Sequence, residues 1–391
     1  MSALVQPDDI LEAGLRVRPW RADDADAVYR ACQDRLIQRW TNVPRPYLPE
    51  HAEGFVTAFT RQSWTTGSAA PFGVFDAATG GMLGSTGLVM INLTKAEAEI
   101  GYWTAPWARG RGHATAAARA VARWALDRLG LTRLIWRAEV GNHASRLVAE
   151  HIGVRVEGLL RHAITRPGGF PTDAWTGSLL PGQLREAAVP ADPVATTRAR
   201  TFSGAQPRLT RLTEPSTGSG GGRPVALRAP HWGDIAGIVS ACQDPESARW
   251  TTVPAPYRTV DAEYFVGGHA PGLWLRGEGA VFAITDPDDA FAGSMELRLT
   301  GPRSASVGYL MAPWARGRGY ATAALRAACL WGFESLGLHR IEWQAYVGNE
   351  ASRRVAQRAG FTLEGVARAG CLQRGEYRDA WTGALLASDP R

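Results

Sequence analysis

Two short arginine- and glycine-rich segments are the clearest candidates for chemistry in this sequence. They occupy residues 105–116 and 312–323, and the two twelve-residue strings differ only where His113 is replaced by Tyr320. Each segment follows a stretch with strand character and opens a stretch with helical character. The first backbone N–H groups of a helix have no intrahelical acceptor and lie at the positive end of the helix dipole. The two segments therefore predict two sites that bind an anion such as phosphate.

The residue types within each loop fit this chemistry. Gly110 and Gly112 carry no side chain, so a phosphate can come close to the backbone. Arg109 and Arg111 add positive charge, and an arginine can bind a phosphate in bidentate geometry. The order of residues differs from the GxGxxG of dinucleotide folds and from the GK[ST] of a P-loop. A plain strand-to-helix turn is the alternative interpretation, and the occurrence of a second copy makes it the weaker one.

The similarity between the two halves extends far beyond the loops. An Asp-Ala-Trp-Thr-Gly string begins at Asp173 and again at Asp379, and the order of all shared landmarks is the same in both halves. A period of about 200 residues is a whole domain rather than a solenoid repeat. We therefore predict an N-terminal domain over residues 1–182, a Pro/Gly/Ser-rich linker over residues 183–223 and a C-terminal domain over residues 224–391.

The pattern of apolar residues within each half indicates alternating strands and helices. In the first half, apolar positions recur at helical spacing over residues 114–129, until Gly130 ends the helix. Residues 134–140 then have strand character, and residues 143–152 have the character of a short helix. Strands arranged around central helices indicate an α/β or mixed α+β fold rather than an all-helical one.

Composition excludes several classes of protein. With 391 residues, 45% of them hydrophobic, the chain can form two ordinary cores. We expect no membrane-spanning helix, no secretory signal and, because the four cysteines show no metal-binding spacing, no metal site. A reduced, cytoplasmic protein is the default expectation. The net charge is +6, but the arginines form no run, so we expect no nucleic-acid partner, although that alternative rests on charge alone.

Around both loops the sequence resembles the GNAT acetyltransferases. The loops fit the R/Q-x-x-G-x-G/A signature of that family, once from Arg109 to Ala114 and once from Arg316 to Ala321. The flanking segments resemble the RimJ/RimL-like branch, the ribosomal-protein N-terminal acetyltransferases. These segments are Ile100-Gly101-Tyr102-Trp103, Gly141-Asn142-x-x-Ser145-Arg146 and Gly168-x-x-x-x-Asp173, with counterparts in the second half at Val307-Gly308-Tyr309, Gly348-Asn349-x-x-Ser352-Arg353 and Gly375-x-x-x-Asp379.

The resemblance implies two tandem GNAT domains, each with a mixed central sheet that splays between its fourth and fifth strands and is flanked by helices. Acetyl-CoA would lie in the split, with its pyrophosphate on the backbone of the loop and its pantetheine arm along the strand before it. In the first half the implied cofactor-binding residues are Trp103, Thr104, Arg109, Gly110, Arg111, Gly112, His113, Ala114, Thr115 and Asn142. In the second half they are Leu310, Met311, Arg316, Gly317, Arg318, Gly319, Tyr320, Ala321, Thr322 and Asn349.

The resemblance also implies direct transfer of the acetyl group to an amine, which must first lose a proton to a base. Glu99 stands where family members often hold that base, whereas Ser306 stands at the matching place in the second half. We therefore predict that the N-terminal half is the better-equipped catalyst. Glu97 shares the face of Glu99 by strand alternation, and a solvent-facing pair is the alternative. Glu296, on the preceding strand, is a weaker candidate base for the second half.

The leaving thiolate benefits from a proton donor. Many members of the superfamily carry a tyrosine on the helix after the Asn turn, but Ala149 and Ala356 stand at the corresponding positions. Ser145 and Ser352 are then the nearest hydroxyl candidates, with a helix-cap or cofactor contact as the equally weighted alternative. Candidate acceptor-binding residues are Trp40, Tyr47, Asp173, Trp250, Tyr257 and Asp379. Core packing of the aromatic rings, and pairing of the aspartates with an arginine or a backbone N–H, are the alternatives for these positions.

The sequence as a whole predicts an acetyl-CoA-dependent N-acetyltransferase. Its acceptor would be a primary amine, either on a small molecule or natural product or at the N-terminus of a peptide or protein. The alternative is a regulatory protein that binds acyl-CoA and is catalytically inactive in at least one half. No membrane partner is expected.

Overall fold

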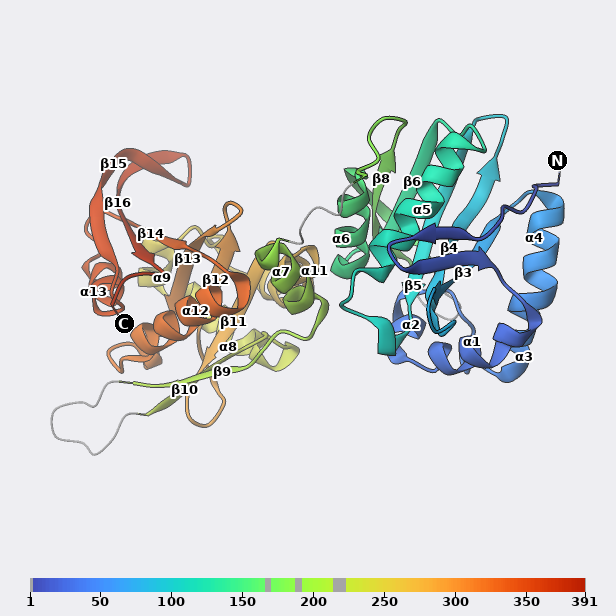
Figure 1. Cartoon of the computed structure of the whole chain (residues 1–391). Helices are drawn as coiled ribbons and strands as arrows, with labels where there is room; N and C mark the ends of the chain where they lie inside the picture. The colour runs from blue at the N-terminus through green and yellow to red at the C-terminus, as the bar shows by residue number, and fades with distance from the viewer. Residues whose placement is uncertain (1–2, 166–169, 187–191, 214–222, 391) are drawn as a thin grey trace. The chain divides into compact units, whose positions relative to one another are not determined.

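The computed structural model describes residues 3–165, 170–186, 192–213 and 223–390. It divides into two compact units, Met1–Asp192 and Pro193–Arg391, each with its own sheet and flanking helices (Figure 1). Within the described residues, no helix is long and apolar enough to cross a membrane. The predicted mixed fold in two tandem copies is confirmed.

The first unit is built on an eight-stranded sheet with the order β1-β2-β3-β4-β5-β6-β8-β7. Every neighbouring pair is antiparallel except β5 and β6. The strands are β1 (Ile10–Glu12), β2 (Leu15–Pro19), β3 (Ala70–Asp76), β4 (Met82–Asn92), β5 (Glu97–Thr104), β6 (Arg133–Glu139), β7 (Arg155–Ile164) and β8 (Thr172–Leu179). The helical segments are η1 (Ala22–Asp24), α1 (Ala25–Cys32), α2 (Arg35–Trp40), α3 (Pro49–Gly54), the π-helical turn η2 (Phe55–Phe59), α4 (Thr60–Thr66), η3 (Pro106–Ala108), α5 (His113–Asp127) and α6 (His143–Ile152).

The second unit repeats this arrangement with the order β9-β10-β11-β12-β13-β14-β16-β15. Its strands are β9 (Leu209–Leu212), β10 (Pro224–Arg228), β11 (Gly279–Thr285), β12 (Phe291–Leu299), β13 (Ser304–Met311), β14 (Arg340–Tyr346), β15 (Thr362–Gln373) and β16 (Glu376–Leu386). Its helical segments are α7 (Pro193–Ser203), η4 (Trp232–Asp234), α8 (Ile235–Gln243), α9 (Pro245–Trp250), α10 (Thr259–Tyr264), the π-helical turn η5 (Phe265–His269), α11 (Ala270–Arg276), η6 (Pro313–Ala315), α12 (Tyr320–Leu336) and α13 (Glu350–Arg358).

Part of the segment that the sequence assigned to a linker is ordered structure in the second unit. Helix α7 packs on α12: Arg198 Nε donates to the carbonyl oxygen of Leu336 at 2.7 Å, and Phe202 is buried against Trp274 with ring centroids 4.9 Å apart. Strand β9 pairs with β10. The glycine-rich run at residues 219–222, for which a flexible linker was predicted, lies outside the described residues.

The two parallel strands of each sheet separate soon after they meet. Strand β5 pairs with β6 only from Glu97 to Glu99, although β5 continues to Thr104. Strand β13 pairs with β14 from Ser304 to Val307 and continues to Met311. This is the predicted splay. It falls between the fifth and sixth strands rather than the fourth and fifth, because β1 and β9 each add an edge strand.

The helix after each loop is held on the sheet by a buried aromatic cluster. In the first unit, Trp124 of α5 meets Phe72 of β3 and Trp64 of α4, with ring centroids 5.3 and 6.0 Å apart. All three side chains are buried. In the second unit, Trp331 of α12 and Phe282 of β11 form the matching edge-to-face pair, with centroids 5.5 Å apart. The packing of these rings holds each long helix against its sheet.

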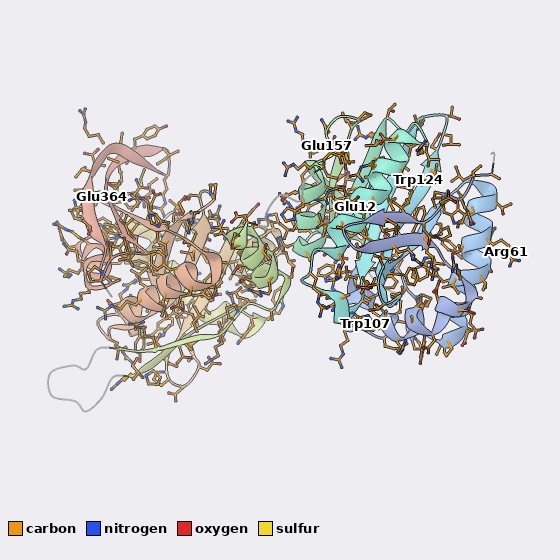
Figure 2. The ribbon with its side chains drawn as sticks, in the orientation of Figure 1. Glu12, Arg61, Trp107, Trp124, Glu157 and Glu364 are labelled. Atoms are coloured by element: carbon orange, nitrogen blue, oxygen red, sulfur yellow. The ribbon has the colours of Figure 1, made fainter. Side chains whose placement is uncertain are left out.

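We expect Trp124→Ala to destabilise the first unit by about 3–5 kcal/mol, because the substitution leaves a cavity in a close-packed core. Urea unfolding followed by circular dichroism measures this loss. Trp107→Ala is the matched control (Figure 2). Trp107 is half-exposed and its indole donates one hydrogen bond, to the carbonyl oxygen of Met82 at 2.8 Å, so its loss should cost only about 1 kcal/mol. Equal losses from both variants would contradict this account of the core.

Candidate functional site

The two loops have the backbone conformation that their glycines allow. Gly110 and Gly112 have φ of +76° and +78°, and Gly317 and Gly319 have +74° and +77°. Residues with a side chain avoid this left-handed region, which explains the glycine at each place. No described atom lies within 4 Å of the position that a Cβ would take at Gly110, Gly112 or Gly317. The backbone of each loop therefore faces open space at the start of a long helix.

The N–H groups at that start are free of helical hydrogen bonds. Helix α5 begins at His113, and the backbone N–H of Ala116 donates back to Gly112 at 3.1 Å. The preceding N–H groups have no residue four positions earlier within the helix to accept from them. Gly112 caps the helix without any side-chain hydrogen bond, and Gly319 does the same for α12. Each loop thus presents unpaired donors at a helix N-terminus, which is the arrangement that binds phosphate.

The first arginine of each loop, predicted to bind phosphate, forms an ion pair within the protein. Arg109 forms an ion pair with Asp34, whose Oδ1 lies 2.5 Å from Nη2. Arg316 pairs with Asp244, with its Nη2 2.6 Å from Oδ2. Burial acts to raise the pKa of Asp34, but the hydrogen bond from Arg109 and the backbone N–H of Ile37 outweigh it, so the pKa is lowered.

These aspartates also cap the short helices on the other side of the site. Asp34 accepts hydrogen bonds from the N–H groups of Leu36 and Ile37 in α2, and Asp244 accepts one from Ser247 in α9. The loop arginine therefore ties the loop to the neighbouring helix pair. The second arginines, Arg111 and Arg318, are exposed, and their side chains form no hydrogen bond or ion pair within the described part of the chain. They remain available for a bound anion.

His113 and Tyr320, the one difference between the loops, behave differently. Tyr320 is buried in the core of the second unit, at 2% exposure. His113 is only partly buried. The backbone of both residues occupies the first position of the long helix. The side chain of Tyr320 therefore serves packing, and only its backbone faces the loop.

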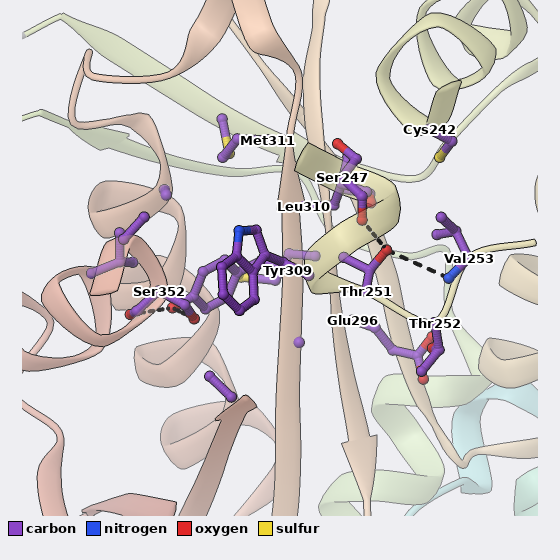
Figure 3. A pocket seen from close by; sticks show the side chains of 18 of the residues that line it. Cys242, Ser247, Thr251, Thr252, Val253, Glu296, Tyr309, Leu310, Met311 and Ser352 are labelled. Atoms are coloured by element: carbon purple, nitrogen blue, oxygen red, sulfur yellow. Dashed lines mark hydrogen bonds between the residues drawn. The ribbon is translucent and has the colours of Figure 1, made fainter. Parts of the chain in front are cut away.

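A tyrosine–serine–tryptophan network crosses the split in both units. The Tyr102 hydroxyl donates to the carbonyl oxygen of Ser145 at 2.8 Å, and the Trp136 indole donates to Ser145 Oγ at 3.1 Å. Tyr309, Trp343 and Ser352 repeat these contacts at 3.0 and 3.1 Å (Figure 3). The sequence had placed the two tyrosines only in a family motif, and it had predicted neither their partners nor a functional role.

Burial raises the pKa of both tyrosines. It raises that of Tyr102 well above the ordinary value, and that of Tyr309 to about 12, against the opposing hydrogen bond from Ser352. Both phenols therefore stay protonated at neutral pH. Within the network, the serine Oγ accepts a hydrogen bond from the indole N–H. The tyrosine hydroxyl is the donor whose hydrogen bond spans the split.

Asn142 and Asn349 cap the helices that follow. Each side-chain oxygen accepts a hydrogen bond from the backbone N–H of the serine three residues later, Ser145 or Ser352, at 3.1 Å. The amide nitrogen of each asparagine is not used by this cap and stays available for the predicted contact with a cofactor arm. The same hydrogen bonds hold the serines in place.

Glu99 lies at the bottom of the split in the first unit. It occupies the last position at which β5 pairs with β6, opposite Ile135. Its carboxylate accepts a hydrogen bond from Arg137 Nη1 at 2.9 Å. Burial raises the pKa of Glu99, against the opposing charge and hydrogen bond of Arg137. Ser306 and Gln344 stand at these positions in the second unit.

A cavity of about 1080 Å³ opens in the second unit and connects the loop to the short helices (Figure 3). Its wall includes Gly317 and Gly319 of the loop, and Leu310 and Met311 at the end of β13 that no longer pairs with β14. The backbone that was predicted to hold a cofactor arm therefore lines a real cavity. The same cavity reaches the far side of the sheet along residues 250–254.

The tip of the β15–β16 hairpin packs against the end of α9, next to this part of the cavity wall. Gln373 is buried, and its amide donates to the carbonyl oxygens of Arg249 and Thr251 at 3.0 and 2.8 Å. Arg374 Nη1 donates to the carbonyl oxygen of Ala248 at 2.8 Å. These contacts fasten the end of α9 and the loop after it. The matching hairpin tip of the first unit includes residues 166–169, which lie outside the described residues.

Glu296 also lines this cavity. One carboxylate oxygen lies 2.8 Å from His269 Nε2, and the other accepts from Arg298 Nε at 2.6 Å. His269 is the last residue of η5 and had not been singled out in the sequence. Glu296 and His269 therefore form a polar pair on the wall of an otherwise largely apolar cavity.

The predicted acceptor-binding aromatics fall into two groups. Trp250 and Tyr257 line the cavity of the second unit. Tyr47 is 5% exposed and packs within the core beneath α1, hydrogen-bonded to Cys32. Trp40 is half-buried under the guanidinium of Arg39, 4.2 Å from the ring centroid. In the first unit, the contacts of Tyr47 are those of a residue packed in the core, which was the alternative to acceptor binding.

The two aspartates of the late motif stabilise backbone turns, as the alternative of a backbone N–H contact predicted. Asp173 Oδ1 accepts from the N–H of His162 at 2.9 Å, and Asp379 Oδ1 accepts from that of Ala369 at 2.8 Å. His162 and Ala369 both have φ of +51°, a conformation that non-glycine residues rarely adopt. The carboxylates thus hold a strained bulge, and Asp379 is not among the residues of the cavity wall.

The first unit has a salt bridge where the second has its open cavity. Arg39 of α2 reaches Glu139 at the end of β6, with Nη2 2.5 Å from Oε1, and Glu139 is 4% exposed. At the matching place in the second unit, Tyr346 lines the cavity. A cavity of about 400 Å³ in the first unit lies elsewhere, between Trp20 and Trp64.

Comparison with known protein families identifies both halves. A family model described as an acetyltransferase (GNAT) domain matches residues 14–155 and 225–362, together more than two thirds of the chain. Among solved structures, Mycobacterium smegmatis RimJ in complex with CoA-disulfide is similar at 25% identity and a TM-score of 0.41, over 46% of this chain and 88% of that chain.

Two proteins of Bacillus subtilis (strain 168) are similar to shorter parts. "Putative ribosomal N-acetyltransferase YdaF" is 44% identical over 84 residues, which are 22% of this chain and 46% of that protein. "Probable N-acetyltransferase YjcK" is 34% identical over 109 residues, 27% of this chain and 60% of that protein. The chain thus spans about half the length of the curated relatives it matches.

The different contacts of the loop arginines lead to a prediction. We expect Arg111→Ala to weaken binding of coenzyme A to the first unit about tenfold, since a charge-assisted hydrogen bond to phosphate is lost. Arg109→Ala should change that affinity much less and should instead loosen α2, because its partner is Asp34. Isothermal titration of the full chain with coenzyme A measures both. A larger loss of affinity from Arg109→Ala than from Arg111→Ala would show that the first arginine leaves Asp34 for the phosphate.

Proposed function

The chain belongs to the GNAT acetyltransferase family, and we propose that it is an acetyl-CoA-dependent N-acetyltransferase that transfers the acetyl group directly to a primary amine. The observation that carries the proposal is the position of each glycine loop. It opens a long helix beside the split of a mixed sheet, and it is repeated in both units. An anion held on the loop would direct the rest of a long ligand into the split.

The residues present fit coenzyme A. The loop N–H groups of residues 111–115 and 318–322 would hold the pyrophosphate, with Arg111 and Arg318 adding charge. The free edge of β5 at Trp103 and Thr104, beyond its pairing with β6, would pair with the amides of the pantetheine arm, as would that of β13 at Leu310 and Met311 beyond its pairing with β14. When bound, acetyl-CoA supplies a thioester carbonyl as the electrophile. The backbone N–H groups of the same strand ends would stabilise the negative charge that develops on the carbonyl oxygen.

We propose Glu99 as the base of the first unit. Its carboxylate lies at the bottom of the split, and burial holds its pKa above the ordinary glutamate value, which brings it closer to the range in which a base works best. It would take the proton of the acceptor amine directly or through a water molecule. Arg137 keeps the carboxylate in one orientation. That the N-terminal half is the better-equipped catalyst stays a prediction.

The tyrosine–serine pair would return a proton to the leaving sulfur. Burial keeps the Tyr102 and Tyr309 hydroxyls protonated, and both already lie in hydrogen-bond contact with the serine, Ser145 or Ser352. A proton given up by one hydroxyl can be replaced from its neighbour. This assigns the serines predicted from the sequence a role beside a tyrosine rather than alone.

For the acceptor we propose the amine of a small molecule or the α-amine of a peptide or protein. The name of the Bacillus subtilis relative YdaF, a ribosomal N-acetyltransferase, supports a protein α-amine. A second candidate function is acyl-CoA binding without turnover in the second half. It is favoured by Ser306 and Gln344, which replace the Glu99–Arg137 pair.

We expect Gly112→Asp and Gly319→Asp each to abolish acetyl-CoA binding in one unit, and the double variant to abolish it in both. Aspartate tolerates the left-handed conformation, and its charge repels the phosphate. Thiol release from acetyl-CoA is measured with aminoglycosides, polyamines, amino acids and peptides that begin with Ser, Ala or Met. Gly14→Asp is the control, since Gly14 has φ of +79° and open space but lies in a turn away from the loop. A double variant with full activity would disprove the assignment of the loops.

A second prediction separates the two halves. In the Gly319→Asp chain, Glu99→Gln should lower thiol release by about 100-fold or more, because general-base catalysis contributes at least that much. In the Gly112→Asp chain, Ser306→Ala should have little effect. Since burial raises the pKa of Glu99, activity of the first unit should fall on the acidic side at a pH above the ordinary glutamate pKa, as the carboxylate gains its proton. Equal, small losses from both variants would remove Glu99 as the base.

A further inference from the structure

The second unit contains an acid–base pair that the first unit lacks. His269 Nε2 lies 2.8 Å from a carboxylate oxygen of Glu296, and the other oxygen of that carboxylate is held by Arg298 at 2.6 Å. We propose that the second unit is a catalytic centre of its own, in which His269, oriented by Glu296, takes the proton of the acceptor amine. This inference rests on the proposed acetyltransferase function and concerns the half for which no base was found at the position of Glu99.

The pair lies where an acceptor amine would meet the donor. Both side chains line the cavity that also includes the glycine loop and the end of β13 that no longer pairs with β14. Glu296 stands directly opposite Gly308 on β13, one residue past the last position at which β13 pairs with β14. Figure 3 shows Glu296 among the cavity side chains, together with Thr251 and Thr252. About a quarter of each side chain of the pair is accessible.

The first unit has different residues at both positions of the pair. Phe59 is the last residue of η2 where His269 ends η5, and Gly87 stands opposite Gly101 where Glu296 stands opposite Gly308. Neither Phe59 nor Gly87 can move a proton. The first unit instead has Glu99, where the second has Ser306. Each unit therefore carries a carboxylate near the split, but on adjacent strands.

The geometry determines which nitrogen of His269 acts. Glu296 accepts the hydrogen of Nε2, which leaves the lone pair on Nδ1 free to receive a proton. The ammonium group of the acceptor would give a proton to Nδ1, and its nitrogen lone pair would form the C–N bond to the acetyl carbonyl carbon. The C–S bond then breaks, and the sulfur takes a proton from the Tyr309 hydroxyl. The nitrogen, positively charged after the attack, loses its second proton, which replaces the one that Tyr309 gave up, and a neutral amide remains. The negative charge of Glu296 stabilises the imidazolium that results.

The charges of the wall point to the chemical class of the acceptor. The carboxylates that line the described cavity are all paired with arginines: Glu246 with Arg249, Asp261 with Arg258 and Glu296 with Arg298. Aromatic and aliphatic side chains make up most of the remaining wall at this end: Ile238, Val253, Pro254, Tyr257, Tyr264 and Phe265. A polycation would find no unpaired carboxylate on this wall. The site should therefore prefer a primary amine attached to an apolar body.

The test uses the full chain with Gly112→Asp, so that only the second unit holds the donor. Thiol release from acetyl-CoA is measured with tryptamine as the apolar amine and spermidine as the polycation. We expect His269→Ala to lower kcat for tryptamine by about 100-fold while KM stays nearly unchanged, because general-base catalysis is lost. Added imidazole should restore part of the rate, since the missing ring leaves space next to the cavity.

Two further variants keep the test independent of folding. His269→Phe copies the first unit, where Phe59 stacks on Phe55 with centroids 5.6 Å apart, so the turn should fold. It should lose the same activity but show no recovery with imidazole. Glu296→Gln should lower kcat by about tenfold or more, because the orientation and charge of the partner are altered. His339→Ala, at an exposed histidine outside the cavity, is the control and should keep full activity.

The outcomes distinguish this inference from the proposed function. A Gly112→Asp chain that binds one acetyl-CoA but releases no thiol, beside an active Gly319→Asp chain, overturns the inference and leaves the proposed function standing. Unchanged kcat in His269→Ala, or a loss that imidazole does not restore, also overturns it. Faster turnover of spermidine than of tryptamine overturns the acceptor class. A wild-type chain that releases no thiol with any amine overturns the proposed function, and this inference with it.

Discussion

The point at which the two parallel strands stop pairing is the constraint on which the rest of each unit depends. Strands β5 and β6 pair over only a few residues, and β13 and β14 do the same. Beyond that point β5 and β13 stay paired with β4 and β12, but the backbone groups on their other edge lack a strand partner, and such groups are costly to leave buried without one. The glycine loop and the long helix start at the same place, so unpaired N–H groups from a strand and from a helix face one space. A ligand with amides and a pyrophosphate satisfies both sets, which explains why the loop, the split and the cavity occur together.

The arginines of the loop show how this donor site is coupled to the other side of the sheet. In both units the first arginine pairs with the aspartate that caps a short helix, 75 residues earlier in the first unit and 72 in the second. Substitution of this arginine would therefore act on the acceptor side through Asp34 or Asp244. The second arginine makes no such contact among the described residues and is left for the anion. Two arginines only two positions apart thus differ in their contacts: the first forms an ion pair within the protein, and the second is exposed.

Local chemistry made the repeat, the glycine loops and the mixed fold predictable from the sequence, because positive φ and helix periodicity depend on neighbouring residues. The contacts that escaped prediction join residues far apart. Tyr102 and Ser145 are separated by 43 positions, and only the fold brings them together. For Asp173 and Asp379 the sequence offered substrate binding or a backbone N–H contact, and the structure shows the contact, at the bulge that each supports. Helix α7 was assigned to a linker because its contacts with α12 are more than 130 residues away.

The two units differ in a way that separates donor chemistry from acceptor chemistry. The loop, the helix-capping asparagine and the tyrosine–serine–tryptophan network are the same in both, down to their hydrogen bonds. The groups able to take a proton are different: Glu99 with Arg137 in one, and His269 with Glu296 in the other. The surroundings differ as well, with the Arg39–Glu139 bridge in one and Tyr346 on a cavity wall in the other. A duplicated domain that keeps the residues around the acetyl donor and changes those around the acceptor is suited to one donor and two different acceptors.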